Sequence, residues 1–80
     1  MREIIIADRG WVFLGMAAVK KIDGARYVVI TEASVIRKWG TTKGIGQIAL
    51  FGPTKETVLD ECGTVKILET EVKARIECCY

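Results

Sequence analysis

The sequence contains no histidine and no asparagine. Histidine is the commonest general base and a frequent zinc ligand, so its absence excludes the Ser/His and Cys/His couples of many hydrolytic enzymes. No nucleophile in the chain has a histidine beside it to accept its proton. We therefore expect a binding or structural protein and not an enzyme, with no cofactor, built as a single domain of residues 1–80.

Long hydrophobic runs are also missing. The longest apolar run covers residues 11–19 and has nine residues, whereas a membrane-spanning helix needs about twenty. Near the start, Glu3 and Asp8 flank only four apolar residues, which is unlike a secretory signal peptide. We expect a cytoplasmic protein that has no membrane partner.

Cysteine is scarce and its count is odd. The three cysteines are Cys62, Cys78 and Cys79. They form no Cys-x-x-Cys pair, and no histidine is available to complete four zinc ligands, so we expect free thiols and no metal. Cys78 alternates with Ile76 and is expected in the core, whereas Cys79 is expected to point outward.

Acidic residues are absent from one long segment of the chain. Residues 33–55 contain the cations Arg37, Lys38, Lys43 and Lys55 and no acid, although the net charge of the whole chain is only +2. A local basic segment in an otherwise balanced chain indicates a localised anion site, and a solvated loop without acids is the alternative.

Most of the remaining sequence alternates with a period of two, which is typical of strands. Strands are expected at residues 3–7, 11–21, from Arg26 to Ile36, at 64–68 and at 72–78. The Asp23-Gly24 pair indicates a hairpin, and residues 69–71 a tight turn. Both faces of the third strand are largely apolar, so that strand is expected to be central or to bend.

The period breaks at residues 40–53, which hold four of the eight glycines and the only proline. We expect a loop here, with a short apolar strand or turn at residues 47–51. Residues 54–60 fit two structures, a short helix capped by Thr54 or a strand around residues 57–59. Five short strands in so small a chain predict an all-β, strongly bent, Sm-like or SH3-like barrel, with a Gly-rich insertion before the last two strands.

Two family resemblances follow from particular residues. The segments Gly10-Trp11-Val12-Phe13-Leu14-Gly15 and Cys62-Gly63-Thr64-Val65-Lys66-Ile67 resemble the two halves of the Sm-like signature. This resemblance implies a barrel and ring-like self-association. The Asn and the Arg-Gly with which Sm-like proteins grip RNA are missing, since the last turn reads Leu68-Glu69-Thr70.

The segment Trp39-Gly40-Thr41-Thr42-Lys43-Gly44-Ile45-Gly46 resembles a family of small uncharacterised bacteriophage proteins that carry a Trp-Gly-Thr-Thr-x-Gly-x-Gly segment. The likeness extends over most of the chain and includes the Cys-Gly-Thr-Val stretch. The resemblance implies a phage or prophage source and expression in the cytoplasm of a bacterial host, and it brings no settled function with it.

The candidate ligand-binding residues lie in this same stretch. They are Arg37, Lys38, Trp39, Thr41, Thr42, Lys43, Gly44 and Gly46. Glycines let backbone N–H groups converge on an anion, threonines add hydroxyl donors, cations add charge, and a tryptophan face stacks on a base. The spacing matches neither a Walker loop nor a dinucleotide fingerprint. The competing interpretation makes Trp39 a core or interface anchor and the threonines and glycines parts of a turn.

Three functions are compatible with these observations. The first is an oligomeric phage-type protein that holds a phosphate-bearing nucleotide, for instance by sequestering a cyclic nucleotide signal of host defence. The second is a nucleic-acid-binding Sm-like module, which the low net charge and the missing RNA-contacting residues disfavour. The third is a structural protein, or one that binds a protein partner through the Gly/Thr loop.

Overall fold

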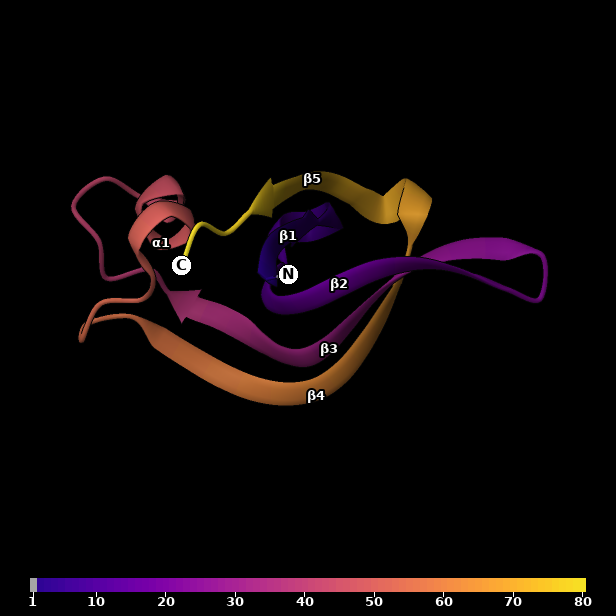
Figure 1. Ribbon diagram of the computed structural model, residues 1–80, viewed down its shortest axis with the longest axis horizontal. Coiled ribbons are helices and arrows are strands. Elements are labelled where there is room, and N and C mark those ends of the chain that lie inside the picture. Colours follow the sequence, from indigo (N-terminus) through magenta and orange to yellow (C-terminus); the bar gives the residue numbers. More distant parts are fainter. Residues whose placement is uncertain (1) are drawn as a thin grey trace.

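The computed structural model describes residues 2–80, which form one five-stranded antiparallel sheet with one α-helix. The strands are β1 (Arg2–Ala7), β2 (Val12–Ile22), β3 (Ala25–Lys38), β4 (Val58–Leu68) and β5 (Val72–Glu77). Helix α1 (Ile45–Phe51) and the short 3-10 turns η1 (Asp8–Gly10) and η2 (Glu69–Glu71) complete the fold (Figure 1). The predicted small all-β barrel-like fold is confirmed, including the insertion before the last two strands.

The strands are ordered β4-β3-β2-β1-β5, so β4 and β5 are the two edges of the sheet. Figure 1 shows β3 and β4 curving beneath β1, with β5 on the opposite side of β1. Within the described residues β4 and β5 do not pair with each other, and the barrel therefore stays open along one seam.

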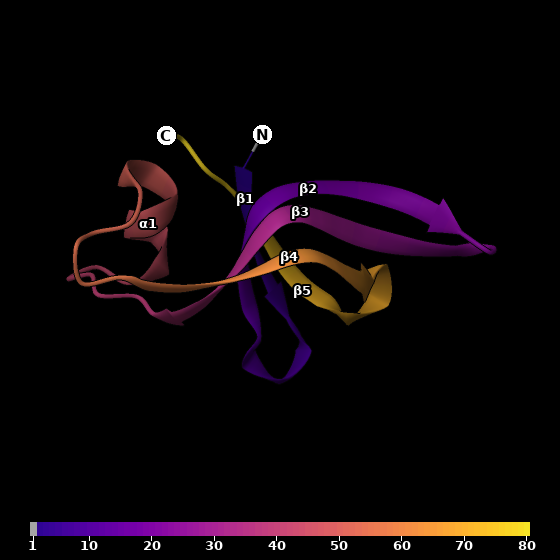
Figure 2. The ribbon, with the colours of Figure 1, turned by 90° about the horizontal axis from the view of Figure 1, so that it is seen from below.

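The hairpin that joins β2 and β3 turns at Asp23 and Gly24, as the sequence predicts. Ile22 pairs with Ala25, and the two turn residues have φ of 50° and 85°. Two central residues in the left-handed region define the turn type whose twist matches a hairpin. The hairpin projects from one end of the molecule, and α1 lies at the other end (Figure 2).

Strands β2 and β3 bend together where their pairing register shifts. The shift lies between Leu14 and Met16 on β2, opposite Glu32, which has a φ of 50°. A Cβ at Gly15 would lie 2.6 Å from Cγ2 of Ile30 and 2.8 Å from the backbone oxygen of Thr31, so only a glycine lets the two backbones approach so closely. The bend explains the two apolar faces of the third strand, which is also an interior strand, between β4 and β2.

Two apolar clusters lie on opposite faces of β1, because Ile4 and Ile5 are adjacent on a strand. Ile5 packs with Phe13, Val28, Ile30 and Ala33 on the face that the curved strands surround. Ile4 packs with Leu14 and Ile36 beneath Ile48 and Ala49 of α1, and with Cys78. Cys78 is buried and Cys79 is exposed, as predicted.

The sequence prediction for residues 47–51 is wrong, because this stretch is helical. Ile45, Ile48 and Ala49 are spaced three and four residues apart, which places them on the helix face that packs on the sheet. Gly52, at φ 89°, ends the helix and donates its N–H to the carbonyl of Ile48 at 2.8 Å.

Of the two structures expected for residues 54–60, the strand is found and the short helix is not, although residues 54–57 are a loop that precedes the strand. Strand β4 begins at Val58 and runs to Leu68, and Gly63, at φ 78°, bends it without interrupting it. Residues 2–80 contain no helix with the length and apolar character needed to cross a membrane.

Candidate functional site

The eight candidate residues lie where β3 ends and the chain crosses to α1. Arg37 and Lys38 are the last residues of β3, residues 39–44 form a loop, and α1 begins at Ile45. After α1, residues 52–57 return to β4. The two loops lie side by side, and we call them together the double loop.

Threonine side chains tie the two halves of the double loop together. The hydroxyl of Thr54 donates to the carbonyl of Gly40 at 2.7 Å, and that of Thr57 donates to the carbonyl of Trp39 at 2.6 Å. Gly40 has a φ of 64°, and a Cβ there would lie 2.3 Å from the carbonyl carbon of Glu56. Gly40 is thus required by both conformation and space.

A second set of hydrogen bonds fixes residues 41–44 against α1. Thr41 donates its hydroxyl to the carbonyl of Gly44 at 2.8 Å, and the hydroxyl of Thr42 lies 3.2 Å from Oε1 of Gln47. The same Gln47 oxygen accepts the N–H of Lys43 at 3.0 Å. A hydroxyl carries one proton, so both threonines have used their only donor within the loop.

Gln47 therefore belongs to the candidate region, although the sequence analysis did not select it. It is the third residue of α1, the position from which a Gln or Glu side chain reaches back over the helix start. In the sequence, the signal for this role is a Gln three residues after Gly44, the spacing at which a side chain reaches back over the start of a helix.

Trp39 is partly covered by the double loop and partly open to solvent. Its side chain is 43 % exposed, and a Cβ at Gly44 would lie 3.6 Å from ring carbon Cζ3. Gly44 therefore lets the loop lie flat against one part of the ring. Gly46 sits in the first turn of α1 with open space where a side chain would be.

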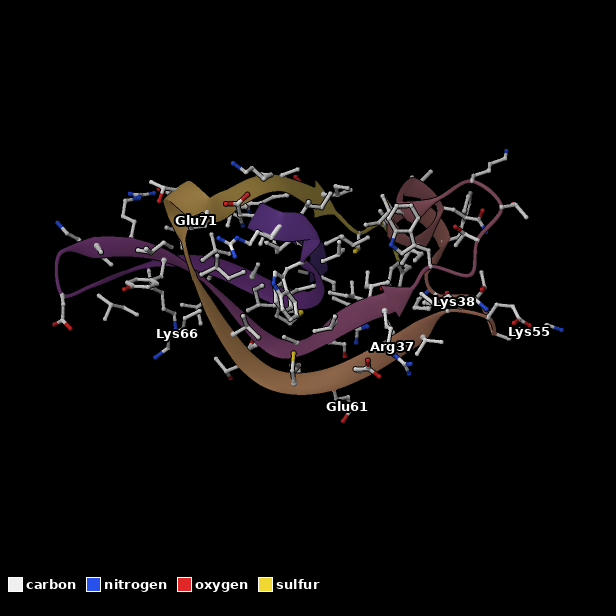
Figure 3. The ribbon with its side chains drawn as sticks, turned by 180° about the vertical axis from the view of Figure 1, so that it is seen from behind. Arg37, Lys38, Lys55, Glu61, Lys66 and Glu71 are labelled. Carbon is white, nitrogen blue, oxygen red and sulfur yellow. The ribbon has the colours of Figure 1, made fainter. Side chains whose placement is uncertain are left out.

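Arg37, by contrast, has a partner on the neighbouring strand. Its Nε lies 2.9 Å from Oδ2 of Asp60. Within residues 2–80 there are four ion pairs, and none includes Lys38, Lys43 or Lys55. Figure 3 shows Lys38 and Lys55 at the same end of the molecule. The unpaired charge of the basic segment is therefore carried by its lysines. Two of them, Lys38 and Lys43, were among the predicted site residues, and Lys55 was not.

The C-terminal segment contacts α1 and Gly52, the residue that follows it. Cys79 donates its N–H to the carbonyl of Ala49 at 2.7 Å, and the Tyr80 ring lies against Gly52. Burial raises the pKa of the Cys78 thiol and of the Tyr80 hydroxyl above their ordinary values. The Arg2 guanidinium lies 5.9 Å from the centre of the Tyr80 ring.

Two hollows lie outside the double loop. One, of about 430 Å³, is lined by Leu14 and Leu59, with the charged groups of Arg2, Glu32 and Glu61 around them. The other, of about 330 Å³, is an apolar groove between Trp11 and Phe13 on one side and Val65 and Ile67 on the other. Neither includes any of the eight candidate residues.

A comparison with known proteins gives no relative: no family model, curated protein or solved structure matches this chain.

Proposed function

We propose that the protein is a non-enzymatic binding protein that holds a phosphate-bearing nucleotide on the double loop. The observation that carries the proposal is the combination of a half-exposed Trp39 with three lysines, Lys38, Lys43 and Lys55, that have no ion-pair partner within residues 2–80. Phosphate requires positive charge, and a nucleobase stacks on an indole face.

The hydrogen bonds inside the double loop also support this function. A loop that is already held in one conformation loses less entropy when a ligand binds. Thr41, Thr42 and Gly44 act in this proposal by shaping the loop, since the hydroxyl protons are used internally. Lys38, Trp39 and Lys43, together with Lys55, make the contacts with the ligand.

The proposal extends to a biological setting that the bacteriophage resemblance suggests. A small protein that only binds serves a phage if it sequesters a cyclic nucleotide made by host defence. Such a protein works in the bacterial cytoplasm without a cofactor or a membrane. We propose that it acts as a homo-oligomer, because an exposed loop on a chain of 80 residues covers only one side of a nucleotide.

Isothermal titration calorimetry against a panel of cyclic mononucleotides and dinucleotides tests the proposal. We expect saturable binding of at least one member, weakened by Trp39→Ala at least about fivefold, since stacking on an aromatic side chain contributes about 1–3 kcal/mol per base. Lys43→Ala should weaken binding as well, and Lys20→Ala, on the projecting hairpin, should not. No heat with any nucleotide, or an unchanged affinity in Trp39→Ala, would refute the proposal.

The nucleic-acid alternative predicts a different result in the same instrument. A protein that neutralises many phosphates loses affinity steeply as salt rises, because each contact releases counterions. Three lysines predict a shallow salt dependence with a mononucleotide. Tight, steeply salt-dependent binding of single-stranded RNA or DNA, without mononucleotide binding, would favour the alternative.

A further inference from the structure

Residues 78–80 leave the sheet after β5 and run onto α1, as Figure 1 shows. The N–H of Cys78 donates to the carbonyl of Arg2 at 3.0 Å. The N–H of Cys79 donates to the carbonyl of Ala49 at 2.7 Å. We call residues 78–80 the strap, because they bond to β1 on one side and to α1 on the other.

The hydrogen bond from the strap satisfies a carbonyl that α1 cannot satisfy by itself. In an α-helix the carbonyl of Ala49 accepts the N–H of the fourth residue after it, which here is Pro53, and proline has no N–H. Cys79 supplies the missing donor. A helix of seven residues is also too short to be stable alone, since isolated helices shorter than about 12–15 residues are marginal in water. Helix α1 therefore depends on the strap and on its packing against the sheet.

The ring of Tyr80 covers the start of the second half of the double loop. Gly52 is buried, and a Cβ added to it would lie 3.4, 3.5 and 3.6 Å from three carbons of this ring. The guanidinium of Arg2 lies 5.9 Å from the ring centre, a distance at which a cation is attracted to an aromatic face. Tyr80 thus packs on a residue that lies two positions before Thr54, whose hydroxyl donates to the carbonyl of Gly40.

The first half of the double loop depends on α1 as well. The side chain of Gln47 accepts the N–H of Lys43 at 3.0 Å and lies 3.2 Å from the hydroxyl of Thr42. Gln47 reaches these groups because the first turn of α1 carries it back over the helix start. Both halves of the double loop are therefore connected to α1, one through Gln47 and the other through Gly52.

Within residues 2–80, one of the two apolar clusters includes no residue of α1 or of the strap. Its buried members are Ile5, Ala7, Phe13, Val28, Ile30 and Ala33. The other cluster, by contrast, takes Ile48, Ala49 and Cys78 from α1 and the strap. A segment opens locally at a lower free energy than global unfolding when the remainder keeps its own core. Helix α1 and the strap can therefore detach while the strands stay paired.

We propose that the strap, α1 and the double loop open and close as one cooperative unit, with Tyr80 as the residue that positions Gly52 and the loop after it. Closure of the strap holds the ligand site in the conformation described above. Opening removes the site without unfolding the sheet. What the closed unit binds rests on the proposed function, whereas its opening is measured without nucleotide.

Hydrogen exchange followed by nuclear magnetic resonance tests the unit in the absence of nucleotide. The reporters are the amides of Lys43, Gly52 and Cys79, and the amides that pair β2 with β3 are the reference. We expect Tyr80→Ala to speed the exchange of all three reporters at least about fivefold and to leave the reference unchanged, because only the unit opens more often. Tyr80→Phe should exchange as the wild type does, since the ring and not the hydroxyl contacts Gly52 and Arg2.

Matched variants separate a local effect from a general one. Tyr27→Ala removes the same kind of ring from β3 beside the projecting hairpin, at the end of the molecule away from α1, and should leave the reporters at wild-type rates. Cys79→Pro removes the N–H that bonds to Ala49 and should speed the exchange of Lys43 and Gly52. Cys79→Ala keeps that N–H and should not. Circular dichroism shows whether each variant is folded.

Nucleotide binding supplies the reciprocal test. A ligand that binds only the closed unit slows the opening of every part of it. At a nucleotide concentration about ten times the dissociation constant, exchange of the Cys79 amide should slow about tenfold, although Cys79 is not part of the ligand site. If the wild type binds no nucleotide while Tyr80→Ala speeds the exchange of all three reporters, only the proposed function fails.

Unchanged exchange of the reporters in Tyr80→Ala would overturn the inference. An equal rise in the reference amides, or loss of the folded state, would do the same, since either result shows that Tyr80 stabilises the whole sheet. Reporters that respond one at a time would show that the strap, α1 and the double loop open separately. A nucleotide that binds without slowing exchange at Cys79 would show that the strap is not coupled to the site.

Discussion

Arg37 and Asp60 form an ion pair between neighbouring strands, with Nε of the guanidinium 2.9 Å from Oδ2 of the carboxylate. The pair joins the end of β3 to the start of β4, on either side of the double loop. Arg37 is the only arginine of the basic segment, and in this conformation its charge is already paired. The pair thus decides how much of the segment's charge is left for an anion.

Removal of Asp60 should release Arg37 toward the ligand. We expect Asp60→Asn to tighten nucleotide binding by up to about fivefold, because an exposed charge contact contributes about 1 kcal/mol or less. Stability should change little for the same reason. Glu69→Gln is the matched control, since it removes the same charge and frees Arg26 far along the chain. Calorimetry that finds both variants equally tightened would show a general charge effect and not a role for Arg37.

The two glycines of the site should respond in opposite directions to alanine. Gly40→Ala should lower the free energy of unfolding by about 2 kcal/mol or more, because the new Cβ meets the Glu56 backbone at a φ of 64°. Gly46→Ala should raise it by about 0.5–1 kcal/mol, since the position is helical and open. Urea unfolding measures both. A stable Gly40→Ala protein would mean that the double loop is not closed as described.

Thr57 should contribute more to stability than the exposed Thr64 of β4. Its hydroxyl donates to Trp39 and accepts the N–H of Thr54 at 2.9 Å, so Thr57→Val removes two hydrogen bonds at once. We expect a loss of about 1–3 kcal/mol and a change in Trp39 fluorescence. Thr64→Val, on exposed β4, should be close to neutral or slightly stabilising. Equal losses of stability in Thr57→Val and Thr64→Val would argue against the hydrogen bond from Thr57 to Trp39 that joins the two loops.

Stability should fall on the alkaline side, and Cys78 should be one cause. Burial raises the pKa of this thiol above its ordinary value of about 9, so the unfolded chain loses the proton first. Its contribution is complete below that ordinary value and is lost as pH rises through the folded pKa. Urea unfolding at rising pH should therefore show a shallower alkaline loss in Cys78→Ala than in the wild type. Equal slopes in the two proteins would contradict this role.

The strands could be predicted because their cause is local. Alternating apolar residues and the Asp23-Gly24 turn determine most of the sheet before any tertiary contact is considered. The position of the bend in β3 was harder to predict from the sequence, since the bend depends on the contact of Gly15 with Ile30 on the neighbouring strand.

Helix α1 could not be predicted so easily, because seven residues between two glycines give a short signal. Its apolar positions, Ile45, Ile48 and Ala49, are helical in spacing, but they sit in a stretch dominated by glycine. The helix is stabilised by tertiary packing, because its buried residues contact Cys78 and Ile36.

The candidate site was selected by its composition, but the partners of its side chains could not be predicted in this way. The ion pair between Arg37 and Asp60 depends on a pairing register that shifts several times along β3 and β4. The bonds of Thr41 and Thr42 depend on α1, which brings Gln47 back over the loop. Composition therefore identified where charge gathers and left open which charges have partners.

The most direct test of the proposed function is a nuclear magnetic resonance titration of the ¹⁵N-labelled protein with the nucleotide that gives the strongest calorimetric signal. We predict that the amides of residues 38–44, the amide of Lys55 and the indole N–H of Trp39 shift together and saturate. Unchanged spectra, or shifts confined to strands β1 and β5, would contradict the assignment of the double loop as the ligand site.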